Sequence, residues 1–253
     1  MGAKVMGAIY VMWYRQVIKT WRSKARIIGS LGQPLLFLLA LGFGLGSVFE
    51  RAGEGSYVDF LVPGIVAMSI LFTAMFSGIE VLWDRQFGFL KETMVAPVPR
   101  WKIMLGRTLG GATMASIQGL IVLCISFAIG FRPASYLTAL ISFVFIFLIA
   151  FTFTAFGTSI AAKMTDMQAF PIIMNFIIMP LFFLSGALFP LKDAPPVLTT
   201  ISRFNPLTYG VDGLRAALSG ASHFPVMLDI AVMAGVALAI GLIGTYLFSK
   251  IEI

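Results

Sequence analysis

Long, uninterrupted apolar stretches dominate the hydrophobic pattern of this chain. Six of them reach the roughly 20 residues that a helix needs to cross a hydrocarbon core of about 30 Å. They lie at 27–49, 60–79, 108–131, 135–162, 167–189 and 226–249, and only the last contains a charged residue, Asp229. None shows the sustained alternation of a barrel strand. Because backbone groups in lipid must bond within their own segment, the pattern predicts six transmembrane helices.

The composition supports the same class. Hydrophobic residues make up 59% and charged residues 11% of the 253 residues, against about 25% charged residues in soluble domains. This balance excludes a cytosolic globular enzyme, a disordered chain and a fibrous protein. One cysteine and one histidine exclude an internal disulfide framework and a cysteine- or histidine-rich metal cluster. We therefore expect an all-α integral membrane protein.

Basic residues set the predicted orientation. With the N-terminus inside, thirteen lysines and arginines fall in inner segments and five in outer ones. The outer ones are Arg51, Arg132, Lys192, Arg203 and Arg215. The asymmetry predicts that both termini face the cytoplasm. No small-residue cleavage site follows the first stretch, so we expect the first span to remain in the mature protein.

The N-terminal segment, 1–26, has the pattern of a helix lying on the membrane surface. Its basic residues recur at steps of four, three and four, and its large apolar residues fall on the opposite face. The basic set is Arg15, Lys19, Arg22 and Arg26, and the apolar set is Tyr10, Trp13, Val17 and Trp21. These two faces predict an interfacial helix, although the basic residues could also serve only to anchor the first span inside.

The segment 84–104 is the most distinctive predicted cytoplasmic loop. The second span can continue as a helix to about Met94, and Pro97 and Pro99 then end it, because proline lacks an amide donor and restricts the residue before it. A new helix starts at about Arg100. The pattern predicts a short helix and a rigid bend, which is either a docking surface for a cytoplasmic partner or an ordinary connection.

The predicted outer segment, 191–225, is too apolar and too regular for a solvated loop. Prolines at 195–196 suit the first turn of a helix, the Asn-Pro pair at 205–206 ends it, and Gly220 ends a second helix. The second helix has an apolar face, Leu207, Val211, Leu214 and Leu218, and a polar face, Thr208, Asp212, Arg215 and Ser219. Asp212 and Arg215 are close enough to pair. We expect a re-entrant or interfacial helical hairpin between spans five and six.

Polar groups inside the predicted spans are few. Glu80 and Asp229 lie near span ends, where we expect water to reach them and their role to be structural, while Gln118 and Asn175 lie mid-span. The chain has no G-x-x-x-x-G-K-[ST] phosphate loop and no catalytic constellation. This scarcity of deep acids and histidines weighs against an ion-coupled carrier and against an enzyme acting on lipid. The phenylalanine-rich spans favour a hydrophobic or amphipathic cargo.

Four motifs carry a resemblance to a known family. They are Tyr57–Ile65 (YVDFLVPGI), the loop 87–100 ending in APVPR, 182–191 (FFLSGALFPL) and 205–215 (NPLTYGVDGLR). The chain resembles the membrane subunit, or permease, of ABC-2 type exporters, in particular the daunorubicin-resistance and nodulation-factor export permeases. It departs from the usual pattern in that Phe87, rather than an acidic residue, precedes Gly88.

The resemblance implies a single transmembrane domain over 1–253 and a homodimer in a bacterial or archaeal cytoplasmic membrane. A pair of ATPase subunits would bind ATP and Mg²⁺, so this chain would hold no cofactor, catalytic residue or metal of its own. The implied ATPase-coupling residues are Phe87, Gly88, Leu90, Glu92, Thr93, Pro97, Pro99 and Arg100. The implied residues of the outer re-entrant hairpin are Pro190, Asn205, Pro206, Tyr209, Asp212 and Arg215.

The function expected from these arguments is outward, ATP-driven export of a drug or a lipid. Export of a polysaccharide or lipid-linked glycan stays open, because such exporters share the architecture. An ion-coupled carrier is a second alternative. None of these functions involves nucleic acid, in spite of the net charge of +7, because the basic residues gather in the predicted cytoplasmic segments.

Overall fold

The computed structural model describes residues 2–51, 56–95, 97–191 and 194–250, and in these ranges every regular element is a helix. The helices are α1 (Gly2–Arg22), α2 (Lys24–Arg51), α3 (Tyr57–Phe76), α4 (Ile79–Gln86), α5 (Phe89–Val95), α6 (Arg100–Ile129), α7 (Tyr136–Ala139), α8 (Ser142–Lys163), α9 (Ala169–Phe183), α10 (Pro196–Phe204), α11 (Pro206–Ser219) and α12 (Val226–Ser249). The predicted all-α class is confirmed. Lys192, counted among the outer basic residues, lies outside the described residues.

Five segments are long and apolar enough to cross a membrane. They are Lys24–Gly44, Tyr57–Gln86, Arg100–Ile129, Tyr136–Lys163 and Val226–Ser249. Each contains most of one predicted span. The remaining predicted span, 167–189, contains α9, which is apolar but only 15 residues long. The structure thus supports a multi-pass membrane protein.

The second predicted span is not one continuous helix. It turns at 77–78 between α3 and α4, and it breaks again at Gly88, whose φ of +81° lies in the left-handed region. A residue without a Cβ adopts this conformation without steric cost, so α4 ends here and α5 begins in a new direction. The expectation that the helix runs unbroken to about Met94 is therefore wrong.

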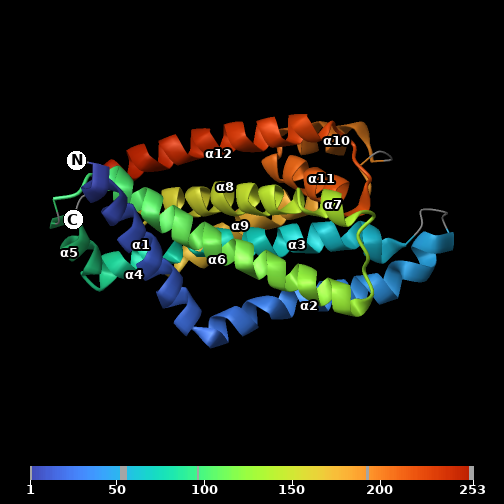
Figure 1. Ribbon diagram of the computed structural model, residues 1–253, viewed down its shortest axis with the longest axis horizontal. Coiled ribbons are helices and arrows are strands. Elements are labelled where there is room, and N and C mark those ends of the chain that lie inside the picture. The colour runs from blue at the N-terminus through green and yellow to red at the C-terminus, as the bar shows by residue number, and fades with distance from the viewer. Residues whose placement is uncertain (1, 52–55, 96, 192–193, 251–253) are drawn as a thin grey trace.

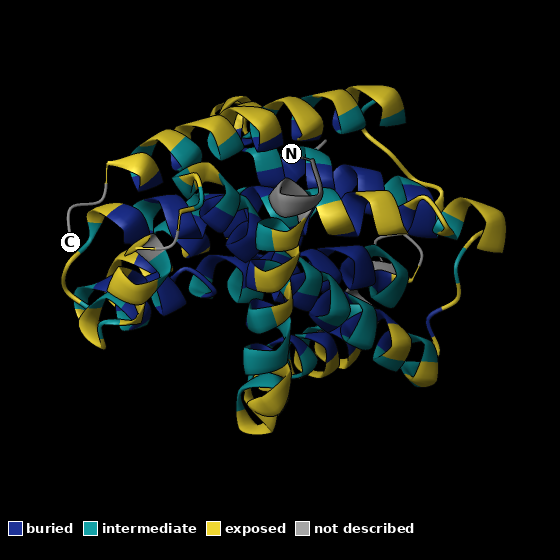
Figure 2. Ribbon diagram, turned by 60° about the vertical axis from the view of Figure 1, so that its left-hand side comes forward, coloured by how far each residue is buried: buried dark blue, intermediate teal, exposed yellow. Residues whose placement is uncertain are grey.

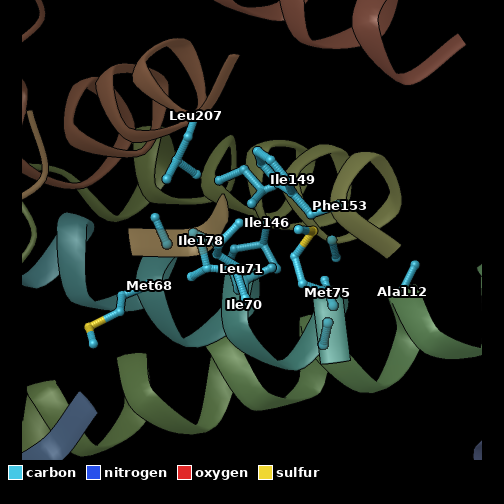
Figure 3. Close-up of a cluster of buried hydrophobic side chains, with 14 of the residues drawn as sticks. Met68, Ile70, Leu71, Met75, Ala112, Ile146, Ile149, Phe153, Ile178 and Leu207 are labelled. Carbon is cyan, nitrogen blue, oxygen red and sulfur yellow. The ribbon is translucent and has the colours of Figure 1, made fainter. Parts of the chain in front are cut away.

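The core is built around α3. This helix packs against α2, α6, α8, α9 and α11, and most of its residues are buried. Figure 3 shows part of this core, where Leu71 and Met75 of α3 lie among side chains of α8, with Ile178 of α9 and Leu207 of α11 nearby. The α3–α4 span is mostly buried inside the bundle, whereas most residues of α12 are exposed or half-buried. The outer helices therefore expose much of their surface (Figure 2), and many of the exposed residues are large and apolar, as lipid contact requires.

The long helices run side by side, so the bundle has two distinct ends (Figure 1). One end carries the start of α1, the helices α4 and α5, and the last turns of α12; the other carries α7, α10 and α11. We call these the α5 end and the α11 end. α1 meets α2 at a corner near Ser23 and lies across α6, where a Cβ on Gly106 would be 2.7 Å from the Cβ of Met12. Close helix approach at this small residue brings α1 against the bundle.

Candidate functional site

A bent segment projects from the α5 end. After α4 ends, Gly88 redirects the chain into α5, and the side chain of Leu90 packs into the core with 1% exposure. Phe87, just before the bend, and Phe89, the first residue of α5, remain 69% and 49% exposed. A short bent segment with one buried anchor and two exposed phenylalanines is the pattern expected of a docking surface.

The rest of the segment has the bend and the new helix start that the sequence predicts. Pro97 and Pro99 are exposed, and α6 starts at Arg100, as the sequence predicts. The Arg100 guanidinium donates to the carbonyl of Ser249 at 2.7 Å, which joins the start of α6 to the end of α12. Glu92 is exposed and Thr93 is half-buried, within 3.4 Å of Arg15 on α1. The predicted coupling residues thus gather on one projection of the bundle.

Two carboxylates lie behind this projection, on α4. Glu80 and Asp84 are one helical turn apart and are 1% and 5% exposed. The expectation that water reaches Glu80 is wrong, because α1, α2 and α6 bring basic side chains against this face of α4. An ionised group buried to this degree needs charged partners.

Four basic side chains supply those partners. Arg26 of α2 lies 2.7 Å from Glu80, and Lys19 of α1 lies 3.3 Å from Glu80 and 3.5 Å from Asp84. Arg15 of α1 lies 3.5 Å from Asp84, and the buried Arg107 of α6 is hydrogen-bonded to the same carboxylate. We call these six residues the charge cluster. It links four helices and carries two more positive than negative charges.

The sequence pattern did not reveal the charge cluster. It placed the basic residues of 1–26 on a surface face and left Asp84 in a loop, while Arg107 lies seven residues inside the long α6 helix. The sequence does contain one indication of the charge cluster. Glu80 and Asp84 are four residues apart, so they lie on one face of a helix at a span end. Acids that are buried there require basic partners.

At the α11 end, the polar face of α11 lines a cavity of about 340 Å³. All four residues predicted for that face, Thr208, Asp212, Arg215 and Ser219, line it, together with Pro190 and His223. The opposite, apolar face is fully buried, as predicted. The helix boundaries at Pro196, Asn205–Pro206 and Gly220 are also those expected from the sequence.

Asp212 and Arg215 do not pair as expected. The Asp212 carboxylate accepts from the backbone amides of His223 and Phe224 at 2.8–3.0 Å, which fixes the turn before α12. The Arg215 guanidinium donates to the carbonyl of Gly186 at 2.9 Å and stacks on the Phe60 ring, 4.1 Å from its centroid. Burial lowers the pKa of Arg215 to about 10, against the opposing effect of nearby Asp212, so the guanidinium stays charged at neutral pH.

The remaining predicted hairpin residues hold its shape. Asn205 caps α11 through the amide of Leu207 and donates to the carbonyl of Leu181 near the end of α9 at 2.6 Å. Pro206 occupies the first turn of α11. The Tyr209 hydroxyl donates to the carbonyl of Arg203, and its ring stacks on Phe224. These contacts join α9, α10, α11 and the turn before α12.

Asp229 differs from every other acid in the described part of the chain. It is 0% exposed, so the expectation that water reaches it is wrong. Neither carboxylate oxygen has a hydrogen-bond partner among the described residues. No group of three or more metal-ligating side chains occurs in the described ranges.

These features define a polytopic, all-helical membrane protein with a projecting bent segment at one end and a helical hairpin at the other. The sequence model of the family described as "ABC-2 type transporter" matches residues 7–219. The chain belongs to this family.

Individual relatives support the assignment. The chain is 31% identical over 213 residues to "Nodulation protein J" of Rhizobium leguminosarum bv. trifolii, covering 83% of this chain and 80% of that protein. It is 28% identical over 221 residues to "Putative transport permease ycf38" of Cyanophora paradoxa, covering 85% and 75%. It is 29% identical over 218 residues to the protein of the same name in Pyropia yezoensis, covering 82% and 72%. The chain is accordingly a membrane transporter subunit.

Proposed function

We propose that this chain is the permease subunit of an ATP-driven ABC exporter, a single transmembrane domain over 1–253 that pairs with a second copy and with two ATPase subunits. The ATPase subunits bind ATP and Mg²⁺, and this chain forms the path along which the cargo crosses the membrane. The observation that carries the proposal is the projecting α5 segment, which exposes Phe87 and Phe89 while Leu90 and the charge cluster fix it to the bundle.

The proposed topology has six spans. The fifth consists of α9 and the turns after it. The 15 residues of α9 cover about 22 Å at 1.5 Å per residue, which is less than the hydrocarbon core of about 30 Å, and the apolar residues 184–189 extend the segment. The hairpin of α10 and α11, within 191–225, is re-entrant from the outer face. α1 lies at the inner interface, and both termini are cytoplasmic in this topology, which is supported by the start of α1 and the end of α12 lying at the same end of the bundle as α5 (Figure 1).

The charge cluster supplies the mechanical path in this proposal. ATPase motion reaches α5, passes around the bend at Gly88 into α4, and moves α1, α2 and α6 through Glu80 and Asp84. Ion pairs between buried side chains resist separation because an unpaired buried charge costs several kcal/mol, about 3–5 by mutational data. In this proposal α6 therefore moves together with α4 through the buried Asp84–Arg107 pair, and α1 and α2 follow through their more exposed pairs.

The proposed cargo is a hydrophobic or amphipathic drug or lipid, which fits the apolar spans. Export of a polysaccharide or lipid-linked glycan is the alternative. It is favoured by the outer cavity, which is lined by hydroxyl groups of Ser56, Ser185 and Ser219 and by the carboxylates of Asp59 and Asp212. An ion-coupled carrier is a weaker alternative, and export that persists after the proton gradient is collapsed would exclude it.

Co-purification tests the proposal. The full chain, co-expressed with an ABC-type ATPase, is expected to retain it in detergent and to stimulate ATP turnover in lipid. Replacing Phe87 and Phe89 with alanine should weaken both effects. Phe43→Ala is the matched control, since Phe43 is 70% exposed on α2. Failure to associate with any ABC-type ATPase, or equal effects of the α5 and α2 variants, would overturn the proposed coupling role.

A further inference from the structure

A second cavity, of about 310 Å³, lies beside the charge cluster. Its walls come from the α1–α2 corner, α3 and α6, and most of them are apolar. Ile27, Pro34, Phe72, Phe76 and Met114 form the apolar wall. Its size falls in the range of small-ligand sites, about 300–1,000 Å³, and neither the coupling segment nor the outer hairpin contributes to it.

One side of this cavity is positively charged. Arg26 lines it, and among the described residues the Arg26 guanidinium bonds to protein through one nitrogen only, to Glu80 at 2.7 Å. The charge cluster, to which Arg26 belongs, has four basic and two acidic side chains. This excess of positive charge favours an anionic group at the Arg26 side of the cavity.

Gln118 of α6 is one of several uncharged polar residues in the cavity wall, with Thr20, Ser30, Gln33 and Thr73. Gln118 is 3% exposed, and its amide nitrogen has no hydrogen-bond partner in the described part of the chain. A buried amide donor without a partner costs free energy. Rotation of the Gln118 side-chain amide by 180° exchanges the positions of its nitrogen and oxygen. The amide N–H can therefore donate a hydrogen bond to an oxygen atom of a ligand in the cavity.

These observations together describe the ligand. We propose that the cavity binds an anionic amphiphile of the bilayer, with its anionic head at Arg26, its apolar chain along Phe72, Phe76 and Met114, and an acyl-linkage oxygen near Gln118. Ester- or amide-linked acyl lipids with an anionic head have this combination of groups. In the proposed topology the ligand comes from the inner leaflet.

Two glycines of α2 provide a matched test of the cavity. Gly29 lines it and Gly32 does not, and a Cβ built on either would meet no atom within 4 Å. Gly29→Leu therefore narrows the cavity without a backbone clash, and Gly32→Leu adds the same side chain elsewhere on the same helix. Both changes improve helix propensity equally, so a difference between them reports occupancy of the cavity.

The full chain is reconstituted in nanodiscs with phosphatidylglycerol that carries a photoreactive diazirine in its acyl chain, and labelled peptides are mapped by mass spectrometry. We expect labelling in 72–76 of α3 and 114–118 of α6, where the acyl chain is placed, and in the facing part of α2, 27–34. Gly29→Leu and Arg26→Gln should each reduce it about tenfold, which corresponds to about 1.4 kcal/mol of binding free energy. Gly32→Leu and Arg26→Lys, which keeps the positive charge, should retain most of the labelling.

Two results would overturn the inference: equal labelling of Gly29→Leu and the unsubstituted chain, or equal labelling by a phosphatidylcholine probe with the same diazirine. The measurement needs no ATPase, so its failure would leave the transport proposal intact. A further arm adds the ATPase and ATP. A label lost during turnover identifies the amphiphile as cargo, a label that persists identifies a resident lipid, and both results support the site.

Discussion

The two ends of the bundle are held together by different kinds of contact. At the α5 end, side chains of four helices meet through ion pairs centred on Glu80 and Asp84. At the α11 end, side chains bond to backbone groups, as Asp212 does to the turn at 223–224 and Asn205 to the end of α9. Side chain–backbone bonds fix a local shape, whereas ion pairs join separate helices. In the proposed mechanism, the α5 end accordingly transmits displacement and the α11 end preserves the form of a cavity.

The largest expected effect is at the buried pair of the α5 end. Asp84→Asn leaves Arg107 with an uncompensated charge, and we expect a loss of about 3–5 kcal/mol in stability. Thermal unfolding in detergent should show a strongly lowered midpoint. Glu92→Gln, at an exposed acid, is the control and should change little. If Asp84→Asn unfolds like the control, the charge cluster does not hold the helices together.

A smaller and more local effect is expected at the α11 end. Asp212→Asn keeps the shape but weakens the bonds from the amides of His223 and Phe224, a loss of about 1.5–3 kcal/mol for hydrogen bonds to a charged group. Hydrogen exchange should rise in 206–224 and stay unchanged in α4 and α5. Faster exchange throughout the protein would show that the two ends are not energetically distinct.

The bend between α4 and α5 gives an intermediate test. Gly88→Ala places a Cβ at a φ of +81°, which costs about 1–2 kcal/mol in the left-handed region. We expect reduced ATP turnover in the complex with an ATPase, while hydrogen exchange of the hairpin stays normal. Gly44→Ala, where a Cβ meets nothing within 4 Å, should leave turnover intact. Normal ATP turnover in the complex that contains Gly88→Ala would show that the bend at Gly88 is not needed for coupling.

The smallest effect is expected at the exposed rim of the charge cluster. Lys19 and Arg15 keep 38% and 40% of their side-chain surface exposed, and pairs of this kind contribute about 0.2–1 kcal/mol. Lys19→Gln should lower stability slightly, and the difference should shrink as salt rises from low to high concentration. A large loss of stability that does not depend on salt would show that Lys19 stabilises the cluster as strongly as Arg107 does.

The sequence predicted the elements well where local chemistry decides them. Apolar length located five of the six predicted spans, and Asn205–Pro206 and Gly220 set the boundaries of α11. The spacing along α11 correctly separated an apolar face, which includes the buried Leu214, from a polar face, which includes Arg215 at the cavity. These features depend on residues within one or two turns of each other, so a pattern along the chain contains them.

The sequence could not show what depends on distant segments meeting. The pairing of Asp84 with Arg107 and Arg15, and the burial of Glu80 and Asp229, arise from helices that pack together across the fold. The break at Gly88 was missed for another reason, because a glycine within a helical pattern is compatible with both a continuous helix and a bend. The structure resolves this choice through the backbone conformation of Gly88.

Site-specific cross-linking tests the central claim most directly, namely that α5 receives the motion of a cytoplasmic ATPase. With the single cysteine, Cys124, replaced by alanine, Phe89→Cys is treated with a short thiol–amine cross-linker in membranes containing the ATPase, and Phe43→Cys serves as the control. The account predicts a permease–ATPase adduct for Phe89→Cys alone. An adduct from neither position, or labelling of Phe89→Cys by a membrane-impermeant reagent applied only from outside, would contradict it.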